Sequence, residues 1–264
     1  MADGTETSDA DWVDPVDRIR KRRIRLVGLA GALAACFLVV TVGGYLRPEP
    51  PPPPPVPVEQ QFRETLETVR LGEGKTLMFR AFEVDDELWR TVRPHELTTV
   101  ENVIIDLGRL HDDSMESMLA FTALRHVRLR HSPVGDAGLA TLARHPGIQI
   151  LNLPHSAVTS EGLAALGEMP GLRFLRIGSS SLSGDSARAF ERLTQLRQLH
   201  LIGIPITDEG LRRIAGMPRL ESLYLDGTSV TDAGWRWLFE NHPHLHVHID
   251  SLHHDDDPGR HRHR

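Results

Sequence analysis

A hydrophobic pattern with a period of 24 residues constrains the fold of this chain more than any other feature. We write the sequence in rows that begin at residues 100, 124, 148, 172, 196 and 220. In each row, the first residue and the residues three, five and ten places later are apolar, at all 24 positions. Because 40% of the chain is hydrophobic, about ten apolar residues would be expected there by chance. A seventh row begins at His244 and adds Val247 and Ile249.

The spacing L-x-x-L-x-L-x-x-x-x-L resembles that of leucine-rich-repeat proteins over residues 100–250. Alternate side chains of a strand point to the same side, so the residues three and five places after each row start face one core. A single repeat cannot bury its own apolar stripe, whereas a stack of repeats forms a continuous core. We therefore predict an α/β solenoid, with parallel strands on its concave face and helices on its convex face.

The second half of each row favours a helix. Serine or threonine occupies the expected N-cap position in four rows: Thr159, Ser183, Thr207 and Thr231. Acidic residues such as Asp208 follow, where the helix dipole favours negative charge. Prolines that stop a helix close three rows: Pro146, Pro170 and Pro218.

Three rows share a second motif, V/I-x-D-x-G at residues 134–138, 206–210 and 230–234. Together with the threonine in two of them, it resembles the V/I-T-D-x-G-L form of bacterial and F-box-associated leucine-rich repeats. The chain departs from the usual family pattern eight residues after each row start. Asparagine or cysteine is common there, but this chain has Gly108, Ser132, Ser156, Ser180, Ile204 and Thr228. No regular asparagine ladder is therefore expected, and no F-box is recognisable.

A membrane anchor is expected before the repeats. Residues 1–25 form an acidic and then basic tail, expected to be disordered and cytoplasmic. Leu26–Leu46 contains 21 residues without a charge, enough for a helix of about 31 Å that spans a bilayer. The basic cluster at 18–25 keeps the N-terminus inside by the positive-inside rule. We therefore expect a single-pass inner-membrane protein with a periplasmic or extracellular repeat domain.

Two alternatives to an uncleaved anchor involve processing. A cleaved secretory signal is one, although the apolar run is longer than an ordinary signal region. The segment Leu33-Ala34-Ala35-Cys36 resembles a lipoprotein lipobox, in which Cys36 would be lipidated after cleavage. All three interpretations place the repeats outside the cytoplasm.

The segments on either side of the repeats have different expected roles. Residues 47–57 are proline-rich and favour an extended polyproline stalk. Residues 58–99 show a helical apolar stripe and an extended stretch from Leu77 to Val84, and are expected to cap the first repeat. Residues 251–264, rich in His, Asp and Arg, are expected to form a disordered tail.

The outward positions of the predicted strands provide a candidate binding site. Arginine, histidine and aromatic residues are concentrated there, and Tyr and Arg are enriched at binding hot spots. Arginine can also hold a carboxylate or phosphate through two hydrogen bonds. The candidate ligand-binding residues on the concave face are His126, Arg128, Arg130, Asn152, Phe174, Arg176, His200 and Tyr224. An ordinary decorated solenoid surface is the alternative, and Asp226 and Asp250 would form an acidic flank.

Other chemistry has less support in the sequence. Eight of the 15 histidines lie at 242–264, and alternate histidines on a strand could share Zn²⁺ or Ni²⁺. A metal-binding cell-envelope protein is therefore the alternative function, although no metal site or cofactor is assigned. No P-loop, nucleophile elbow or His-Glu-x-x-His motif occurs, and the net charge of −6 offers no broad basic surface for nucleic acid. The sequence favours a non-catalytic module that binds a protein or an envelope polymer.

Overall fold

The computed structural model describes residues 55–250 of the chain. The strands are β1 (Thr76–Phe79), β2 (Val84–Asp85), β3 (Asn102–Ile105), β4 (Gly108–Arg109), β5 (His126–Leu129), β6 (Ile150–Ser156), β7 (Phe174–Ser179), β8 (Gln198–Ile202), β9 (Ser222–Asp226) and β10 (His246–Ile249). The α-helices are α2 (Val58–Arg70), α3 (Asp86–Trp89), α4 (Asp136–Ala143), α5 (Ala187–Phe190), α6 (Asp208–Ala215) and α7 (Asp232–Asn241). The 3₁₀ segments are η1 (Pro94–Glu96), η2 (Asp112–Ala120), η3 (Gly162–Glu168) and η4 (Gly184–Ser186).

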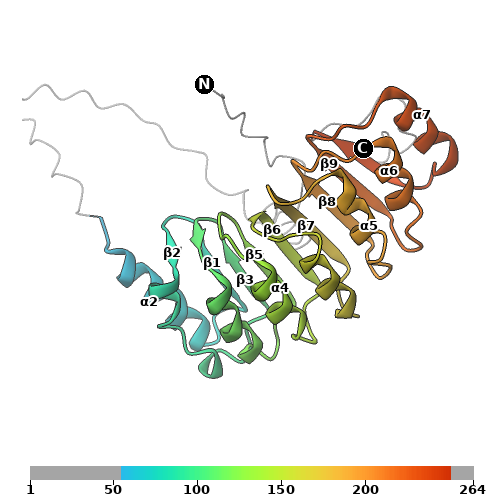
Figure 1. Cartoon of the computed structure of the whole chain (residues 1–264). Coiled ribbons are helices and arrows are strands. Elements are labelled where there is room, and N and C mark those ends of the chain that lie inside the picture. The colour runs from blue at the N-terminus through green and yellow to red at the C-terminus, as the bar shows by residue number, and fades with distance from the viewer. Residues whose placement is uncertain (1–54, 251–264) are drawn as a thin grey trace, which may run out of the picture. The chain divides into compact units, whose positions relative to one another are not determined.

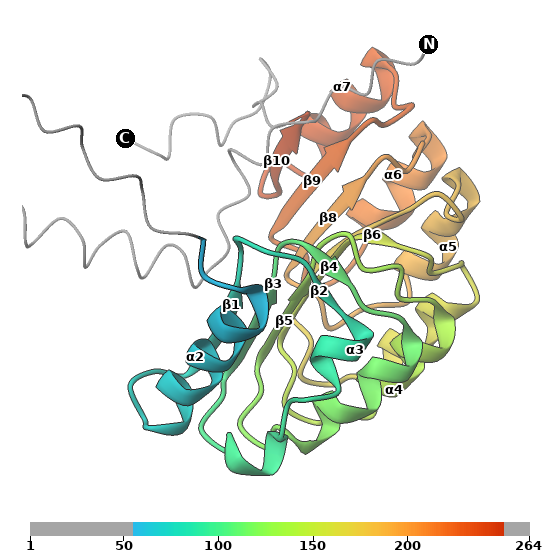
Figure 2. The same ribbon diagram turned by 90° about the vertical axis from the view of Figure 1, so that its left-hand side faces the viewer.

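Eight strands form one parallel sheet in the order β1-β3-β5-β6-β7-β8-β9-β10. Leu175 of β7 pairs with Leu151 on one side and Leu199 on the other, and Leu199 pairs with Leu223. The register therefore advances by 24 residues per strand, as the repeat predicted. Helices α4 to α7 follow one another along the same side of this sheet (Figures 1 and 2). These features confirm the α/β solenoid of leucine-rich-repeat type.

The core lies between the sheet and the helical layer. Leu151, Leu175, Leu199 and Leu223 are fully buried, and a single apolar cluster extends from Phe62 to Val247. Each strand contributes to this cluster the residues three and five places after its row start, while the intervening side chains point to the opposite face. The alternation thus separates the buried face of the sheet from the face that carries the candidate site.

The N-terminal end of the solenoid contains one more repeat-like turn than the rows from 100 to 244 predict. Strand β1 pairs in parallel with β3, with Leu77 opposite Val103 and Phe79 opposite Ile105. The offset is 26 residues instead of 24, which hid this turn from a search at fixed period. Helix α2 precedes it, and Phe62 stacks on Phe79 with ring centroids 4.7 Å apart.

The helical halves of the repeats are less uniform than expected. Thr207 and Thr231 are N-caps, as predicted, and each hydroxyl accepts a hydrogen bond from a glycine N–H three residues later. Three repeats instead form 3₁₀ segments: η2, η3 and, before the short α5, η4. In η3, Gly162 and Gly167 lower helix propensity, and Thr159 bonds the preceding repeat instead of capping.

An aspartate in each of several repeats binds the next repeat. Asp136 accepts hydrogen bonds from the backbone N–H and hydroxyl of Thr159, at 2.8 and 2.7 Å. Asp208 accepts from the same two groups of Thr231, both at 2.8 Å. Asp208 lies in the first turn of α6, as the sequence predicts, and these bonds join it to the neighbouring repeat as well. The threonine and aspartate of the motif are therefore partners across both of these junctions.

The glycine of the motif makes room for this aspartate. A Cβ at Gly162 would lie 1.9 Å from Asp136 Oδ1, and a Cβ at Gly234 would lie 2.3 Å from Asp208 Oδ1. Both distances are far below a normal contact, so a side chain at either glycine would require the carboxylate to shift. We call the Asp, Thr and Gly of such a junction the inter-repeat staple. At the first junction Ser114 stands in the glycine position, and its hydroxyl donates a hydrogen bond to Asp86.

One junction replaces both ends of the staple. Ser160 stands where the aspartate would be, and Ser186 stands where the glycine would be. Their hydroxyl oxygens are 2.7 Å apart, so a smaller polar pair fills the same space. This paired change accounts for Ser186 in the place of the motif's glycine.

The staple should make stability depend on acidic pH. Hydrogen bonds from the backbone and then the side chain of Thr231 hold the pKa of Asp208 below its model-compound value of 3.8. A group with a depressed folded-state pKa stabilises the fold above its unfolded pKa, and this stability is lost as pH falls through the folded pKa. We expect Asp208→Asn to be less stable than the wild type at pH 7 and to lose less stability below pH 4. Urea unfolding at pH 7 and pH 3 measures this, with the exposed Asp113→Asn as the control.

Short hydroxyl side chains bond neighbouring turns where many leucine-rich repeats have asparagine. Ser132 Oγ accepts from Leu110 N at 3.3 Å, and Ser156 Oγ donates to Gly178 O at 3.0 Å. Thr228 Oγ1 donates to Ile206 O at 2.9 Å. These bonds link side-chain hydroxyl groups to the backbone of neighbouring turns.

The parts of the chain outside residues 55–250 include several predictions made above. The tail at 1–25, the membrane helix at 26–46, most of the stalk and the tail at 251–264 lie outside the described residues. Among the helices within the described range, none has the length and apolar character needed to cross a bilayer.

Candidate functional site

The sheet face opposite the core carries a row of polar side chains in register. Arg128 pairs with Asn152, Asn152 with Arg176, and Arg176 with His200 on successive parallel strands. His200 then pairs with Tyr224, and Tyr224 with His248. We call these six residues the polar ladder: Arg128, Asn152, Arg176, His200, Tyr224 and His248.

The first end of the ladder is held by an ion-pair cluster. The Arg128 guanidinium lies 2.8 Å from Asp106 Oδ1, and the Arg80 guanidinium lies 3.2 Å from Asp106 Oδ2. Both pairs are more than half shielded from water, so solvent screens them less than an open surface pair. Asp106 therefore orients Arg128, and Arg80, which directly follows β1, holds Asp106 in turn.

The middle of the ladder contains a chain of three polar groups. Arg176 Nε donates to His200 Nδ1 at 3.2 Å, and His200 Nε2 lies 2.6 Å from Asp226 Oδ2. Because an arginine N–H can only donate, Nδ1 accepts and we assign the ring proton to Nε2, which donates to Asp226. Both ring nitrogens of His200 are thus engaged, an arrangement that suits positioning of Arg176 better than proton transfer.

The last part of the ladder is aromatic. Tyr224 stacks on His248, with ring centroids 4.4 Å apart and an interplanar angle of 12°. His248 Nε2 lies 2.8 Å from His246 Nε2. Asp250 accepts a hydrogen bond from Gly227 N, and Asp226 is paired with His200, so both acids at this end of the sheet have local partners.

The histidines do not gather into a metal centre within residues 55–250. His246 and His248 meet as a pair, but no group of three or more ligand-type side chains in this range could hold a metal ion. Burial, and then the neighbouring His244, lower the pKa of His242. Any larger set of ligands would need the histidines at 253–263, which lie outside the described residues.

The eight predicted site residues all map to the face that carries the ladder. Five belong to the polar ladder, His126 and Phe174 lie one column away, and Arg130 follows Arg128 by two residues. Of these eight residues, all except Arg130 and Phe174 are buried. Phe174, Gln198 and Ser222 in the flanking column are half-buried. The ladder is thus more enclosed than an open solvated sheet, and the flanking column is its more accessible side.

Arg80 and Asp106 are part of the site but were not among the predicted residues. A period of 24 aligns Asp106 with Phe82, whereas the observed 26-residue offset aligns it with Arg80. The apolar residues Leu77, Phe79 and Val84 repeat Val103, Ile105 and Leu110 at the same offset. That match was the available sequence signal for the missing arginine.

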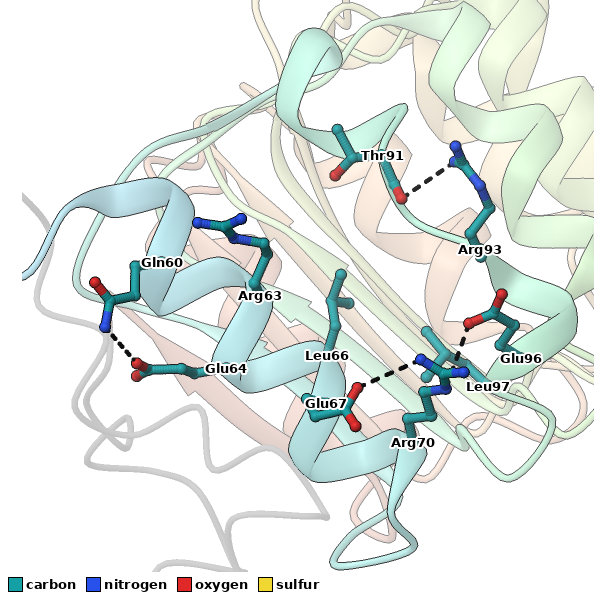
Figure 3. Close-up of a pocket in the computed structure, with 10 residues that line it drawn as sticks. All are labelled: Gln60, Arg63, Glu64, Leu66, Glu67, Arg70, Thr91, Arg93, Glu96 and Leu97. Atoms are coloured by element: carbon teal, nitrogen blue, oxygen red, sulfur yellow. Dashed lines mark hydrogen bonds and ion pairs between the residues drawn. The ribbon is translucent and has the colours of Figure 1, made fainter.

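A pocket of about 490 Å³ lies away from the ladder, between α2 and residues 91–97 (Figure 3). Leu66 and Leu97 contribute its apolar lining. Arg93 donates to the carbonyls of Arg90, Thr91 and Val92. Arg70 pairs with Glu67 and Glu96. Arg93 and Arg70 of this pocket are thus bound to nearby backbone carbonyls and glutamate carboxylates.

No family model matches the chain, and no curated protein sequence matches it. One solved structure with a detectable likeness is an internalin from Listeria monocytogenes, at 18% identity and a TM-score of 0.34. The match covers 52% of this chain and 51% of that one, about half the length of each. The assignment of a leucine-rich-repeat type solenoid rests on the strand register described above.

Proposed function

We propose that the chain is a non-catalytic binding module whose polar ladder contacts a protein or an envelope polymer. The observation that supports it most directly is the register of Arg128, Asn152, Arg176, His200 and Tyr224 on five adjacent strands. Hydrogen-bonding and aromatic groups then recur about every 4.8 Å across the sheet. An elongated partner that crosses the strands could contact several of them at once.

The proposal includes a location. The charge-free segment Leu26–Leu46 and the basic residues before it support a single-pass anchor with the N-terminus in the cytoplasm. The proline-rich residues 47–57 would hold the repeats outside that membrane, in the periplasm or at the cell surface. Intact mass of the membrane-extracted protein tests this arrangement, because a lipoprotein would lack residues 1–35.

Photo-crosslinking of the full-length chain in its own membrane tests the binding role. A crosslinker at the half-buried Phe174 should capture a discrete partner, and the combined variant Arg128→Ala, Arg176→Ala, Tyr224→Ala should reduce capture by about tenfold or more. The matched control is Arg197→Ala, which removes an exposed arginine paired with Glu221 away from this face. Unchanged capture by the folded triple variant would rule out the ladder as the binding surface.

A further inference from the structure

We propose that His246 and His248 bind a divalent transition-metal ion of tetragonal geometry, with Cu²⁺ bound most tightly. Both histidines belong to β10, the last strand in the order of the eight-stranded sheet. The site lies away from Arg128 and Arg176, so it does not rest on the binding role proposed above. Three features support it: the distance between the two imidazoles, the ring contacts that hold them and the access of water to them.

Two imidazole nitrogens lie close together on this strand. His246 and His248 are alternate residues, so their side chains project to the same face of the sheet. Nε2 of His246 lies 2.8 Å from Nε2 of His248. The unprotonated nitrogen of a neutral imidazole is the commonest protein ligand for transition metals. The strand therefore brings two potential ligand atoms of the right chemical type to one place.

The separation fits one coordination geometry better than another. With metal–nitrogen bonds of about 2.05 Å, two ligands at about 90° lie about 2.9 Å apart, whereas two ligands at the tetrahedral angle lie about 3.3 Å apart. The observed 2.8 Å matches the right-angled arrangement, which Cu²⁺ and Ni²⁺ adopt with nitrogen and oxygen ligands. Affinities of divalent ions also rise to a maximum at Cu²⁺, above both Ni²⁺ and Zn²⁺. Geometry and affinity therefore favour the same ion.

The same distance fits a hydrogen bond, which is the state expected without a metal. One ring then carries its proton on Nε2 and donates it to Nε2 of the other ring. A metal ion needs the lone pairs of both Nε2 atoms, so the donor ring must move its proton to Nδ1. The ion takes the place of that hydrogen bond, and neither imidazole has to lack a partner in the metal-free protein.

Ring contacts hold the two imidazoles in position. His248 stacks on Tyr224, with ring centroids 4.4 Å apart and an interplanar angle of 12°. His246 lies edge-on to His248, with an interplanar angle of 81°. Tyr224 is itself buried, so His248 rests on a fixed surface. Ligands that are held before the ion arrives lose less freedom when it binds, and Tyr224 is therefore a positioning residue.

The pair is accessible from one side. His248 is buried but His246 is half-buried, and β10 is the edge strand of the sheet among residues 55–250 (Figure 2). Two histidines are fewer than the three protein ligands of a typical catalytic zinc site, so water would fill the remaining positions of the ion. The acids Asp226 and Asp250 follow Tyr224 and His248 by two residues, and negative charge at this end of the sheet favours a cation.

Titration of the full-length chain with CuCl₂ alone tests the proposal, with calorimetry for affinity and electron paramagnetic resonance for the ligands. We expect the first equivalent of Cu²⁺ to have two equatorial imidazole nitrogens and to bind more tightly than Ni²⁺ or Zn²⁺. His246→Gln and His248→Gln should each weaken binding about tenfold or more and remove one nitrogen from the spectrum. A glutamine amide can still hydrogen-bond the remaining ring but is a poor substitute for imidazole as a Cu²⁺ ligand. Circular dichroism confirms that each variant is folded.

Further variants test the role of Tyr224 and the specificity of the pair. Tyr224→Ala should weaken Cu²⁺ binding severalfold, whereas Tyr224→Phe, which keeps the stacked ring, should bind normally. The matched control is the double variant His131→Gln, His155→Gln. It also removes two neighbouring imidazoles, but these rings stack in parallel with centroids 4.2 Å apart and do not converge on one point. The control should leave the first equivalent of Cu²⁺ unchanged.

The histidines of the C-terminal tail provide the decisive comparison. Alanine at positions 253, 254, 261 and 263 of the full-length chain should leave the affinity and the spectrum of the first equivalent unchanged. Loss of that equivalent in the tail variant would place the ion in the tail and overturn the proposal. Unchanged affinity in either His246→Gln or His248→Gln would overturn it too, as would Zn²⁺ binding as tightly as Cu²⁺.

Discussion

Leu201→Ala is expected to lower the free energy of unfolding by about 2–5 kcal/mol, whereas Ile202→Ala, the next residue of the same strand, should cost less than about 1.5 kcal/mol. Leu201 is fully buried in the core, and Ile202 is half-buried on the ladder face. Both substitutions remove a branched aliphatic side chain of the same size. The difference between them therefore measures which face of β8 packs against the helices.

Chemical denaturation of the full-length chain and both variants measures these values, and hydrogen exchange adds their location. Each repeat in a solenoid contacts mainly its neighbours, so loss of Leu201 should raise exchange first in β7, β8 and β9. The same cost for both variants would contradict the register, because only one of two adjacent strand residues can face the core. A large cost for Ile202→Ala alone would place the core on the ladder face.

The strands were predictable because their information is local and repeated. Alternation within β8 identifies Leu199 and Leu201 as inward, and the 24-residue period aligns them with Leu175 and Leu223 without knowledge of any side-chain contact. The turn that contains β1 escaped because two extra residues shift its register. A fixed period detects equal spacing only, whereas the fold tolerates insertions in the loops between strands.

The face of the candidate site was predictable, but its pairings were not. Strand alternation places Arg176, His200 and Asp226 on one side of the sheet from the sequence alone. Which nitrogen of His200 bonds which neighbour depends on rotamers, and these are set by the surrounding side chains. The same limit applies to Arg128. Strand alternation places Asp106 on the same face of the sheet, but it does not show that the two side chains form an ion pair.

The inter-repeat staple shows a further limit of single-repeat reasoning. Within its own helix, Asp208 is an ordinary first-turn acid that favours the dipole. Only the next turn of the chain shows that its carboxylate accepts both donors of Thr231. The sequence did contain an indication, since the aspartate and the glycine are replaced together at Ser160 and Ser186. The change is not paired at every junction, because Gly184 replaces the aspartate while Gly210 is kept, and Ser114 replaces the glycine while Asp86 is kept.

Gly162→Ser should destabilise the fold by about 2–3 kcal/mol, the second large effect that we expect. The new Cβ would occupy the space of Asp136 Oδ1, 1.9 Å away, and would drive the carboxylate from its two hydrogen bonds with Thr159. Loss of hydrogen bonds to a charged group accounts for an effect of this size. The control is Gly167→Ser in the same 3₁₀ segment, where a Cβ meets no atom within 4 Å and a change within about 0.5 kcal/mol is expected.

The double variant Asp136→Ser, Gly162→Ser completes a thermodynamic cycle. It copies the pair that the chain already uses at Ser160 and Ser186, whose hydroxyl oxygens are 2.7 Å apart. If the two positions interact directly, the double variant should be more stable than the sum of the single effects predicts, by about 1–2 kcal/mol. Additive effects would mean that Asp136 and Gly162 act independently, and the staple would then be a coincidence of spacing. A positive coupling would instead identify the aspartate and glycine of the motif as a contact between repeats, selected for the stacking of the solenoid and separate from any ligand on its other face.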